Sequence, residues 1–116
     1  MSIAIKRIYA EPEEEDGFRV LVDGLWPRGI SKQKARIDIW IKEIAPSSQL
    51  RKWFAHDPEK WDEFRDRYFK ELGLKGDLVE SVKSYARRGK VTLLFSATDE
   101  EHNNAAALRD FLDSPP

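Results

Sequence analysis

The stretch KVTLLFSA, residues 90–97, decides the fold class of this 116-residue chain. Five apolar or β-branched residues stand in a row in it, which is typical of a central strand covered on both faces. Residues 18–25 contain a second continuous apolar run and predict another buried strand. Alternating patterns at residues 3–9 and 37–41 predict two further strands, and these are less buried than the first two.

Helix-start and helix-stop signals fill most of the remaining sequence. Asp57 followed by Pro58 is a start signal, because aspartate caps a helix and the missing N–H of proline costs nothing in the first turn. Gly73 and Gly89 supply stop signals. We expect helices over residues 57–72, 76–88 and 100–113, preceded by a short helix capped by Ser47 or Ser48.

Helix-flanked, continuously apolar strands predict a three-layer α/β fold with a small, largely parallel sheet of about four strands. No linker or repeat divides the chain, so we expect residues 1–116 to form one domain. The connection at residues 10–17 is short for a crossover helix, and we therefore expect the first two strands to be antiparallel. The acidic run EPEEEDG within it, residues 11–17, predicts a solvated loop.

The composition narrows the classes of function. Lys and Arg number 20 against 21 Asp and Glu, and this balance argues against a strong sequence-independent grip on nucleic acid. The lack of cysteine excludes a thiol nucleophile and Cys-ligated zinc. With no metal-ligand spacing or common nucleotide-binding loop, we expect neither a metal nor a cofactor. The N-terminus predicts no signal peptide and no segment predicts a membrane span, so we expect a cytoplasmic protein. The composition does not indicate the oligomeric state of the protein.

Two polar segments follow predicted strands. DGLWPR, residues 23–28, follows the strand at 18–25, and SATDEEHNN, residues 96–104, follows the strand at 90–97. In open α/β sheets, ligands bind beyond the carboxyl ends of the strands. The two segments are therefore expected to meet at one edge of the sheet and to form a cleft.

His102, Asp99 and Asp23 are the candidate catalytic residues of this cleft. A histidine oriented by Asp99 would act as a general base in hydrolysis or group transfer. Structural roles stay open for the two acids, because Asp99 suits the N-cap of the last helix and Asp23 suits a turn cap.

Arg28, Trp26 and Asn103 are the candidate ligand-binding residues. A guanidinium on a Pro-Gly turn suits a phosphate or carboxylate, so a small anionic ligand is the expected partner. The indole would cover a flat or apolar part of that ligand, and the amide would recognise a polar group. Packing of Trp26 in the core is the alternative.

A non-catalytic regulatory or interaction protein is the second hypothesis. Basic residues on the predicted helices, with two tryptophans among them, would form the face that contacts nucleic acid. The same helices carry acids of opposite sign, a pattern typical of a solvated, ion-paired surface.

Three segments together resemble a known family: DGFRVLVDGLWPRGISK (16–32), IAPSSQLRKWFAHDPEKWDEFRDRYFKEL (44–72) and VTLLFSATDEEHNNAAAL (91–108). They are similar to the YeaO-like proteins, the domain of unknown function 488. The resemblance implies a small α/β protein and leaves the biochemical activity open. The family pattern usually reads V-D-R-L-W-P-R-G, and Gly24 stands here in place of its first arginine. If that arginine helps to bind an anion in relatives, we expect this chain to bind the anion more weakly or not to use it.

Overall fold

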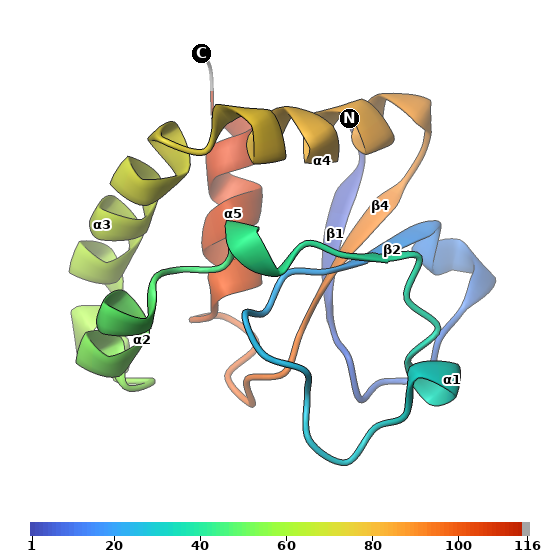
Figure 1. Cartoon of the computed structure of the whole chain (residues 1–116), viewed down its shortest axis with the longest axis horizontal. Helices are drawn as coiled ribbons and strands as arrows, with labels where there is room; N and C mark the ends of the chain where they lie inside the picture. The colour runs from blue at the N-terminus through green and yellow to red at the C-terminus, as the bar shows by residue number, and fades with distance from the viewer. Residues whose placement is uncertain (115–116) are drawn as a thin grey trace.

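A four-stranded sheet forms the centre of the computed structural model, which describes residues 1–114 (Figure 1). The strands lie in the order β1-β4-β2-β3, and every pairing is parallel. All five residues of β4 are buried, which confirms the prediction of a central strand from the run at 90–97. The strands are β1 (Ile3–Arg7), β2 (Phe18–Leu21), β3 (Ile39–Trp40) and β4 (Val91–Phe95).

The helices agree closely with the start and stop signals. Ser47 caps α2 by accepting a hydrogen bond from the N–H of Leu50 at 3.2 Å, and Asp57 caps the next turn through the N–H of Glu59. None of the helices within residues 1–114 has the length and apolar character to cross a bilayer. The α-helices are α1 (Lys32–Ala35), α2 (Ser48–Phe54), α3 (Trp61–Gly73), α4 (Gly76–Arg88) and α5 (Asn104–Asp113); single 3₁₀ turns are η1 (Glu14–Asp16), η2 (Lys42–Ile44) and η3 (Pro58–Lys60).

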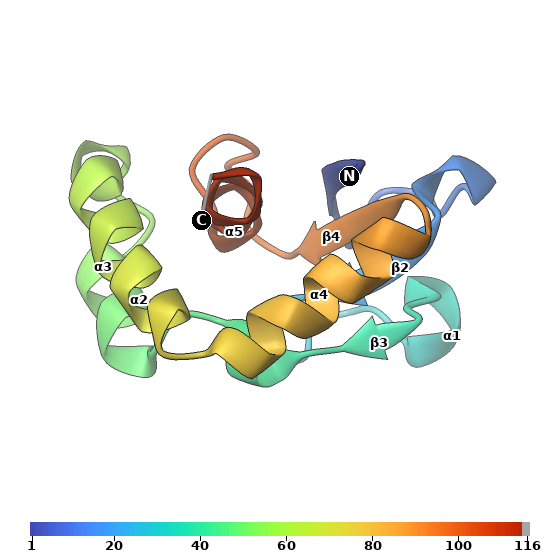
Figure 2. The same cartoon turned by 90° about the horizontal axis from the view of Figure 1, so that it is seen from above.

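The sheet separates two hydrophobic clusters. Val20 and Leu93 face the larger cluster, which α3, α4 and α5 cover. Leu21 and Leu94, one position further along each strand, face a smaller cluster that includes Ala35 of α1. Figure 2 shows α2, α3 and α5 on one side of the sheet, α1 on the other, and α4 passing in front of the strands in this view. Because side chains alternate along a strand, adjacent residues of β2 and β4 serve both layers, which is the expected three-layer α/β arrangement.

The prediction of an antiparallel first pair is wrong. β1 and β2 do not pair; each lies parallel to β4, on opposite sides of it. A buried acid, rather than a crossover helix, stabilises the short return connection. The carboxylate of Asp16 accepts hydrogen bonds from Lys6 of β1 at 3.0 Å and Arg19 of β2 at 2.5 Å, and its carbonyl accepts one from Thr92 of β4 at 2.6 Å. The acidic run is therefore not fully solvated, since Asp16 is only 6% exposed.

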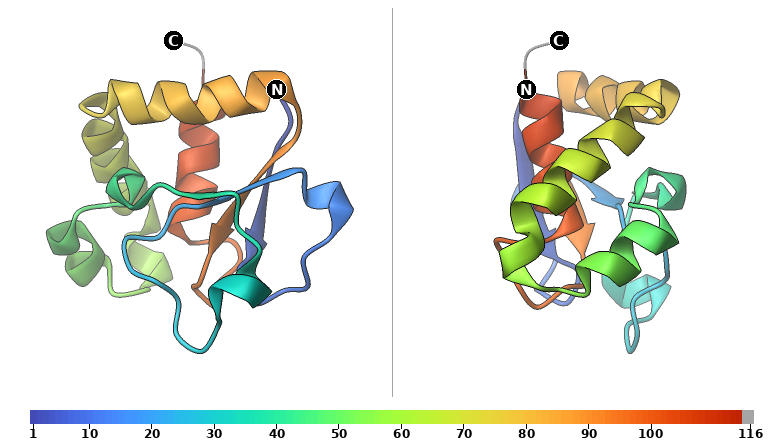
Figure 3. Two further views of the ribbon diagram at one scale, coloured as in Figure 1. Left: turned by 45° about the vertical axis from the view of Figure 1, so that its right-hand side comes forward. Right: turned by 90° about the vertical axis from the view of Figure 1, so that its left-hand side faces the viewer.

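The parallel order brings the carboxyl ends of the strands to one end of the molecule. α4 crosses the opposite end, where β1 and β4 begin (Figure 3). The segments that follow β2 and β4 consequently emerge on the same side, as neighbours. This arrangement sets the location of the candidate site.

Candidate functional site

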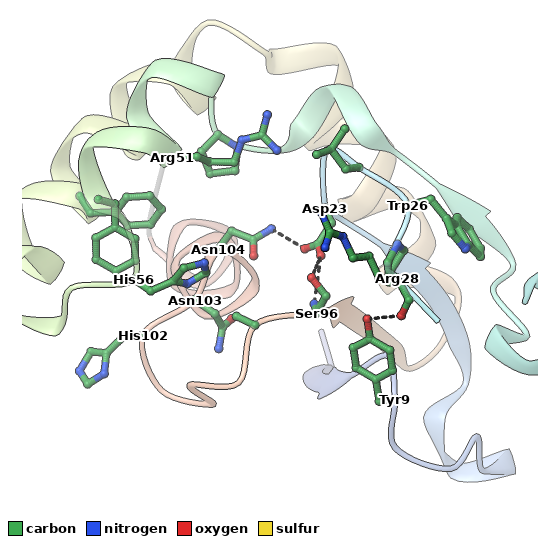
Figure 4. Close-up of a pocket in the computed structure, with 16 residues that line it drawn as sticks. Tyr9, Asp23, Trp26, Arg28, Arg51, His56, Ser96, His102, Asn103 and Asn104 are labelled. Atoms are coloured by element: carbon green, nitrogen blue, oxygen red, sulfur yellow. Dashed lines mark hydrogen bonds between the residues drawn. The ribbon is translucent and has the colours of Figure 1, made fainter. Parts of the chain in front are cut away.

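A pocket of about 420 Å³ lies beyond the carboxyl ends of β2 and β4 (Figure 4). Both polar segments, residues 23–28 and 96–104, contribute side chains to its lining. A third wall comes from residues 46–64, on and around α2 and α3, and Tyr9 closes one side. The structure thus brings Asp23 and His102 to the same pocket, although 79 positions of sequence separate them.

Asp23 joins the ends of the two strands. One carboxylate oxygen accepts hydrogen bonds from the N–H of Ser96 at 3.0 Å and from its hydroxyl at 2.6 Å. The other oxygen accepts one from the side-chain amide of Asn104 at 3.2 Å. Burial raises the pKa of Asp23, while the hydrogen bonds from Ser96 and Asn104 and the charge of Arg51 act in the opposite direction. Both oxygens therefore have protein partners, and the carboxylate fixes the floor of the pocket.

Arg51, on α2, places a guanidinium in the pocket wall with few partners. One of its N–H groups donates to the hydroxyl of Ser48 at 3.1 Å. Its Nε is buried and has no hydrogen-bond partner within residues 1–114. Within residues 1–114, one other buried side-chain nitrogen has no hydrogen-bond partner, the Nε of Arg65. The guanidinium of Arg65, however, forms an ion pair with Asp110. Arg51 makes no such ion pair among the described residues, although its charge acts on the carboxylate of Asp23.

Arg28 lies on the turn that forms the opposite wall. Its side chain is exposed, makes no ion pair within residues 1–114, and extends toward Asp23 (Figure 4). The hydroxyl of Tyr9 donates to the Arg28 carbonyl at 2.7 Å and so fastens the turn. Arg7 contacts the same wall. Its guanidinium donates hydrogen bonds to the carbonyls of Ala97 and Ser96 and lies 5.0 Å from the centroid of the Tyr9 ring.

Trp26 belongs mainly to the core. Its indole N–H donates to the carbonyl of Ile30 at 2.9 Å, and its ring meets Trp40 edge-on at 5.5 Å. Figure 4 shows the indole pointing away from the centre of the pocket, although Trp26 is part of the lining. Its contribution to the pocket is therefore the shape of the turn that carries Arg28.

His102 lies at the far end of the pocket from Asp23, and its ring points away from that carboxylate (Figure 4). Its Nδ1 is 2.9 Å from a carboxylate oxygen of Asp99, and its ring meets Trp61 edge-on at 5.3 Å. Asp99 also accepts the N–H groups of Glu101 and His102, and these two bonds, with that from the His102 ring, lower the pKa of Asp99. The histidine is thus oriented, but not toward Asp23.

Asn103 caps the last helix, a role that the sequence left to Asp99. The side-chain oxygen of Asn103 accepts the N–H of Ala106 at 2.8 Å, and its amide donates to the carbonyl of Asp99 at 3.0 Å. The predicted start of that helix at residue 100 is wrong, because α5 begins at Asn104. Asn103 is 2% exposed, so little of its side chain is available to a ligand.

The charged side chains of the pocket lining, histidines aside, are two arginines and one aspartate. Neither guanidinium, of Arg28 or of Arg51, makes an ion pair within residues 1–114, and the carboxylate of Asp23 already accepts three hydrogen bonds. A guanidinium binds carboxylate or phosphate in a planar, two-pronged manner. Within residues 1–114, no three acid, histidine or cysteine side chains lie close enough together to hold a metal ion.

Comparison with known proteins identifies the family. A sequence model described as "Inactive DUF488-N3 subclade" matches residues 2–115 of the chain. The chain belongs to this subclade. It is also 41% identical over 114 residues to "Uncharacterized protein YeaO" of Escherichia coli K12, covering 98% of this chain and 99% of the relative. It is 39% identical over 110 residues to "Uncharacterized protein Rv3073c" of Mycobacterium tuberculosis H37Rv, covering 95% and 92%. No solved structure matches the chain significantly. The resemblance to the YeaO-like family is thereby confirmed.

Gly24, where this DUF488-N3 chain departs from the usual YeaO-like pattern, lies against Arg51. A Cβ atom at Gly24 would lie 2.7 Å from Nη1 of Arg51 and 3.4 Å from the side chain of Ala45. An arginine at position 24 would therefore displace the Arg51 guanidinium from its present position. The sequence singled out Gly24 but not Arg51, because the contact arises only when α2 packs beside the end of β2.

Proposed function

We propose that this protein binds a small anionic metabolite in the pocket, between Arg28 and Arg51, and does not turn it over. The observation that carries the proposal is the state of Arg51, a pocket-lining cation with one hydrogen bond, a buried unpartnered Nε and no ion pair within residues 1–114. A buried donor that lacks an acceptor costs about 1–3 kcal/mol. The exposed N–H groups of the same guanidinium remain available to an anion in the pocket.

Binding without turnover is favoured over catalysis for two reasons. His102 and Asp23 point to different parts of the pocket, and the three hydrogen bonds of Asp23 leave it little freedom to exchange a proton with a ligand. The subclade to which the chain belongs is described as inactive.

Arg28 offers the first test, because its side chain is exposed and unpaired among the described residues, so that its loss should not disturb folding. We expect Arg28→Gln to lower the affinity for inorganic phosphate about tenfold, since one charge-assisted hydrogen-bonding group is removed. Isothermal titration calorimetry measures this change. Arg88→Gln, which removes an exposed arginine at the end of α4, is the matched control and should bind phosphate like the unmodified protein. Equal affinities for the two variants would count against a role for Arg28.

Gly24→Ala tests the placement of Arg51. The added Cβ would meet Nη1 of Arg51, the far end of a flexible side chain, so we expect Arg51 to move and phosphate affinity to fall about tenfold. The free energy of unfolding should change by less than about 1 kcal/mol. Gly73→Ala is the control, because a Cβ there meets open space. Unchanged phosphate binding in Gly24→Ala would show that the present position of Arg51 is not needed.

An enzyme that moves a proton at His102 is the second candidate function. The 2.9 Å contact between Nδ1 of His102 and Asp99 favours it, because this contact fixes the orientation of the ring. A hydrolase or transferase activity that is present in the purified protein and lost in His102→Gln would support this candidate. Anion binding unchanged in His102→Gln, with no turnover of phosphate esters by either protein, would exclude it for that class of substrate.

Two expectations from the sequence stay predictions: a cytoplasmic location and the absence of nucleic-acid binding. Several of the basic side chains on the helices pair with acids, as Arg67 does with Glu63 and Arg87 with Glu80 at 2.6 Å. Such pairs leave less positive charge for a phosphate backbone. A salt-sensitive shift on a nucleic-acid gel would contradict the second expectation.

A further inference from the structure

The pocket that contains Arg28 and Arg51 has a second, aromatic character. Phe54 and Phe64 both line it, and their rings stack at a centroid distance of 4.3 Å. His56 adds a third ring, 6.5 Å from that of Phe54. Trp61, outside the pocket lining, stacks on Phe64 at 5.6 Å and lies 6.1 Å from Phe54. Side chains from α2, α3 and the loop between them therefore form an aromatic wall.

The rim of the same pocket exposes apolar side chains that the fold does not use. Only four large hydrophobic residues among residues 1–114 are exposed, and two of them, Tyr9 at 41% and Leu25 at 71%, line this pocket. Exposed apolar surface costs free energy in water and commonly marks a binding site when it gathers at a cavity. A ligand that carried charge alone would leave this rim and the exposed ring of His56 uncovered, whereas Phe54 and Phe64 are already covered, at 5% and 2% exposed.

We infer that the bound anion is an aromatic acid, a ring that carries a carboxylate or phosphate group; this inference rests on the proposed function and specifies its ligand. The acid group would bind Arg28 and Arg51, and the ring would lie between His56 and the rim formed by Tyr9 and Leu25. Offset or edge-to-face contact with the exposed rings of Tyr9 and His56 favours a ring over an aliphatic chain of equal size. The volume of about 420 Å³ lies within the range of about 300–1,000 Å³ usual for small-ligand pockets.

Calorimetric titration of matched probes tests the inference. The pairs are benzoate with acetate and phenyl phosphate with inorganic phosphate, and each pair differs by the ring alone. We expect the ring to raise affinity at least about tenfold in both pairs, because burial of a ring removes a large apolar surface from water. Cyclohexanecarboxylate should bind more weakly than benzoate, and benzyl alcohol, which has the ring without the charge, should bind more weakly than either acid.

Leu25→Ser distinguishes the contribution of the apolar rim to ligand affinity from the contribution of the two arginines. The variant should lower affinity for benzoate and phenyl phosphate several-fold and leave acetate and inorganic phosphate unchanged, because Leu25 contributes only apolar contact. Leu74→Ser removes a leucine that is 89% exposed and outside the pocket lining, and it should bind all probes like the unmodified protein.

The possible failures are distinguishable. Equal affinity within each pair, with binding still lost in Arg28→Gln, would overturn the aromatic ligand and leave the anion pocket in place. Cyclohexanecarboxylate that binds as tightly as benzoate would overturn the preference for a ring system with π electrons. No binding of any acid would overturn the proposed function together with this inference.

Discussion

Arg51→Gln is expected to lower the affinity of the pocket for inorganic phosphate or benzoate about 100-fold. The reason is that Arg51 presents its guanidinium to the pocket with one hydrogen bond, to Ser48, and no ion pair among residues 1–114. Hydrogen bonds to charged groups contribute about 1.5–3 kcal/mol, and the upper end of this range corresponds to about 100-fold in affinity. Titration calorimetry of the purified variant measures the loss.

The same variant should unfold at the same denaturant concentration as the unmodified protein, or at a higher one. Glutamine removes the buried Nε of Arg51, which has no hydrogen-bond partner in the described chain, and so removes an unfavourable term from the folded state. A variant that lost more than about 1 kcal/mol of stability but bound anions normally would show that Arg51 is a structural residue. Loss of affinity without loss of stability is the pattern typical of a binding residue.

Asp16→Ala is expected to destabilise the fold by about 3 kcal/mol, because it leaves a buried arginine without its charge partner. Asp16 and Arg19 are 6% and 4% exposed, and Asp16 also accepts a hydrogen bond from Lys6. Chemical denaturation followed by tryptophan fluorescence measures the free energy of unfolding. Glu13→Ala is the matched control: Glu13 also pairs with Lys6, but its side chain is 59% exposed, so its loss should cost less than about 1 kcal/mol. Equal losses in the two variants would contradict a special role for the buried acid.

The contribution of Asp16 also depends on pH. Burial acts to raise its pKa, but the hydrogen bonds from the backbone of Glu13 and from Lys6 and Arg19 outweigh burial, so the pKa of Asp16 is lowered from 3.8. A carboxylate with a lowered pKa in the folded state contributes stability that is complete above its unfolded pKa and is lost as the pH falls through the folded value. The difference in stability between the unmodified protein and Asp16→Ala should therefore persist at neutral pH and shrink on acidification below about pH 4.

The sequence predicted the elements of the fold better than their pairing. The strand at 90–97 and the helix at 76–88 could be predicted because apolar pattern, capping residue and glycine stop all agree there. The direction of the first two strands could not, since nothing local indicates that Asp16 and Arg19 stabilise a short parallel connection. The start of α5 was misplaced because Asp99 and Asn103 are both good capping residues, and only tertiary packing decides between them.

The candidate site was predicted in outline and not in its chemistry. Strand-end polarity correctly pointed to Asp23, Arg28 and His102 as lining residues of one pocket. It missed Arg51, whose position depends on how α2 packs beside the end of β2, and it assigned Asn103 to the ligand rather than to the helix cap. When a neighbouring helix contributes a side chain to a site at the end of a strand, the residues around that strand do not indicate which side chain it is.

A crystal structure of the protein with phenyl phosphate tests the central claim most directly. The account predicts electron density for the phosphate group within hydrogen-bond distance of Arg28 and Arg51, and for the ring between His56 and the rim formed by Tyr9 and Leu25. Density for the anion at other surface residues only, with both arginines unengaged at saturating ligand, would contradict it.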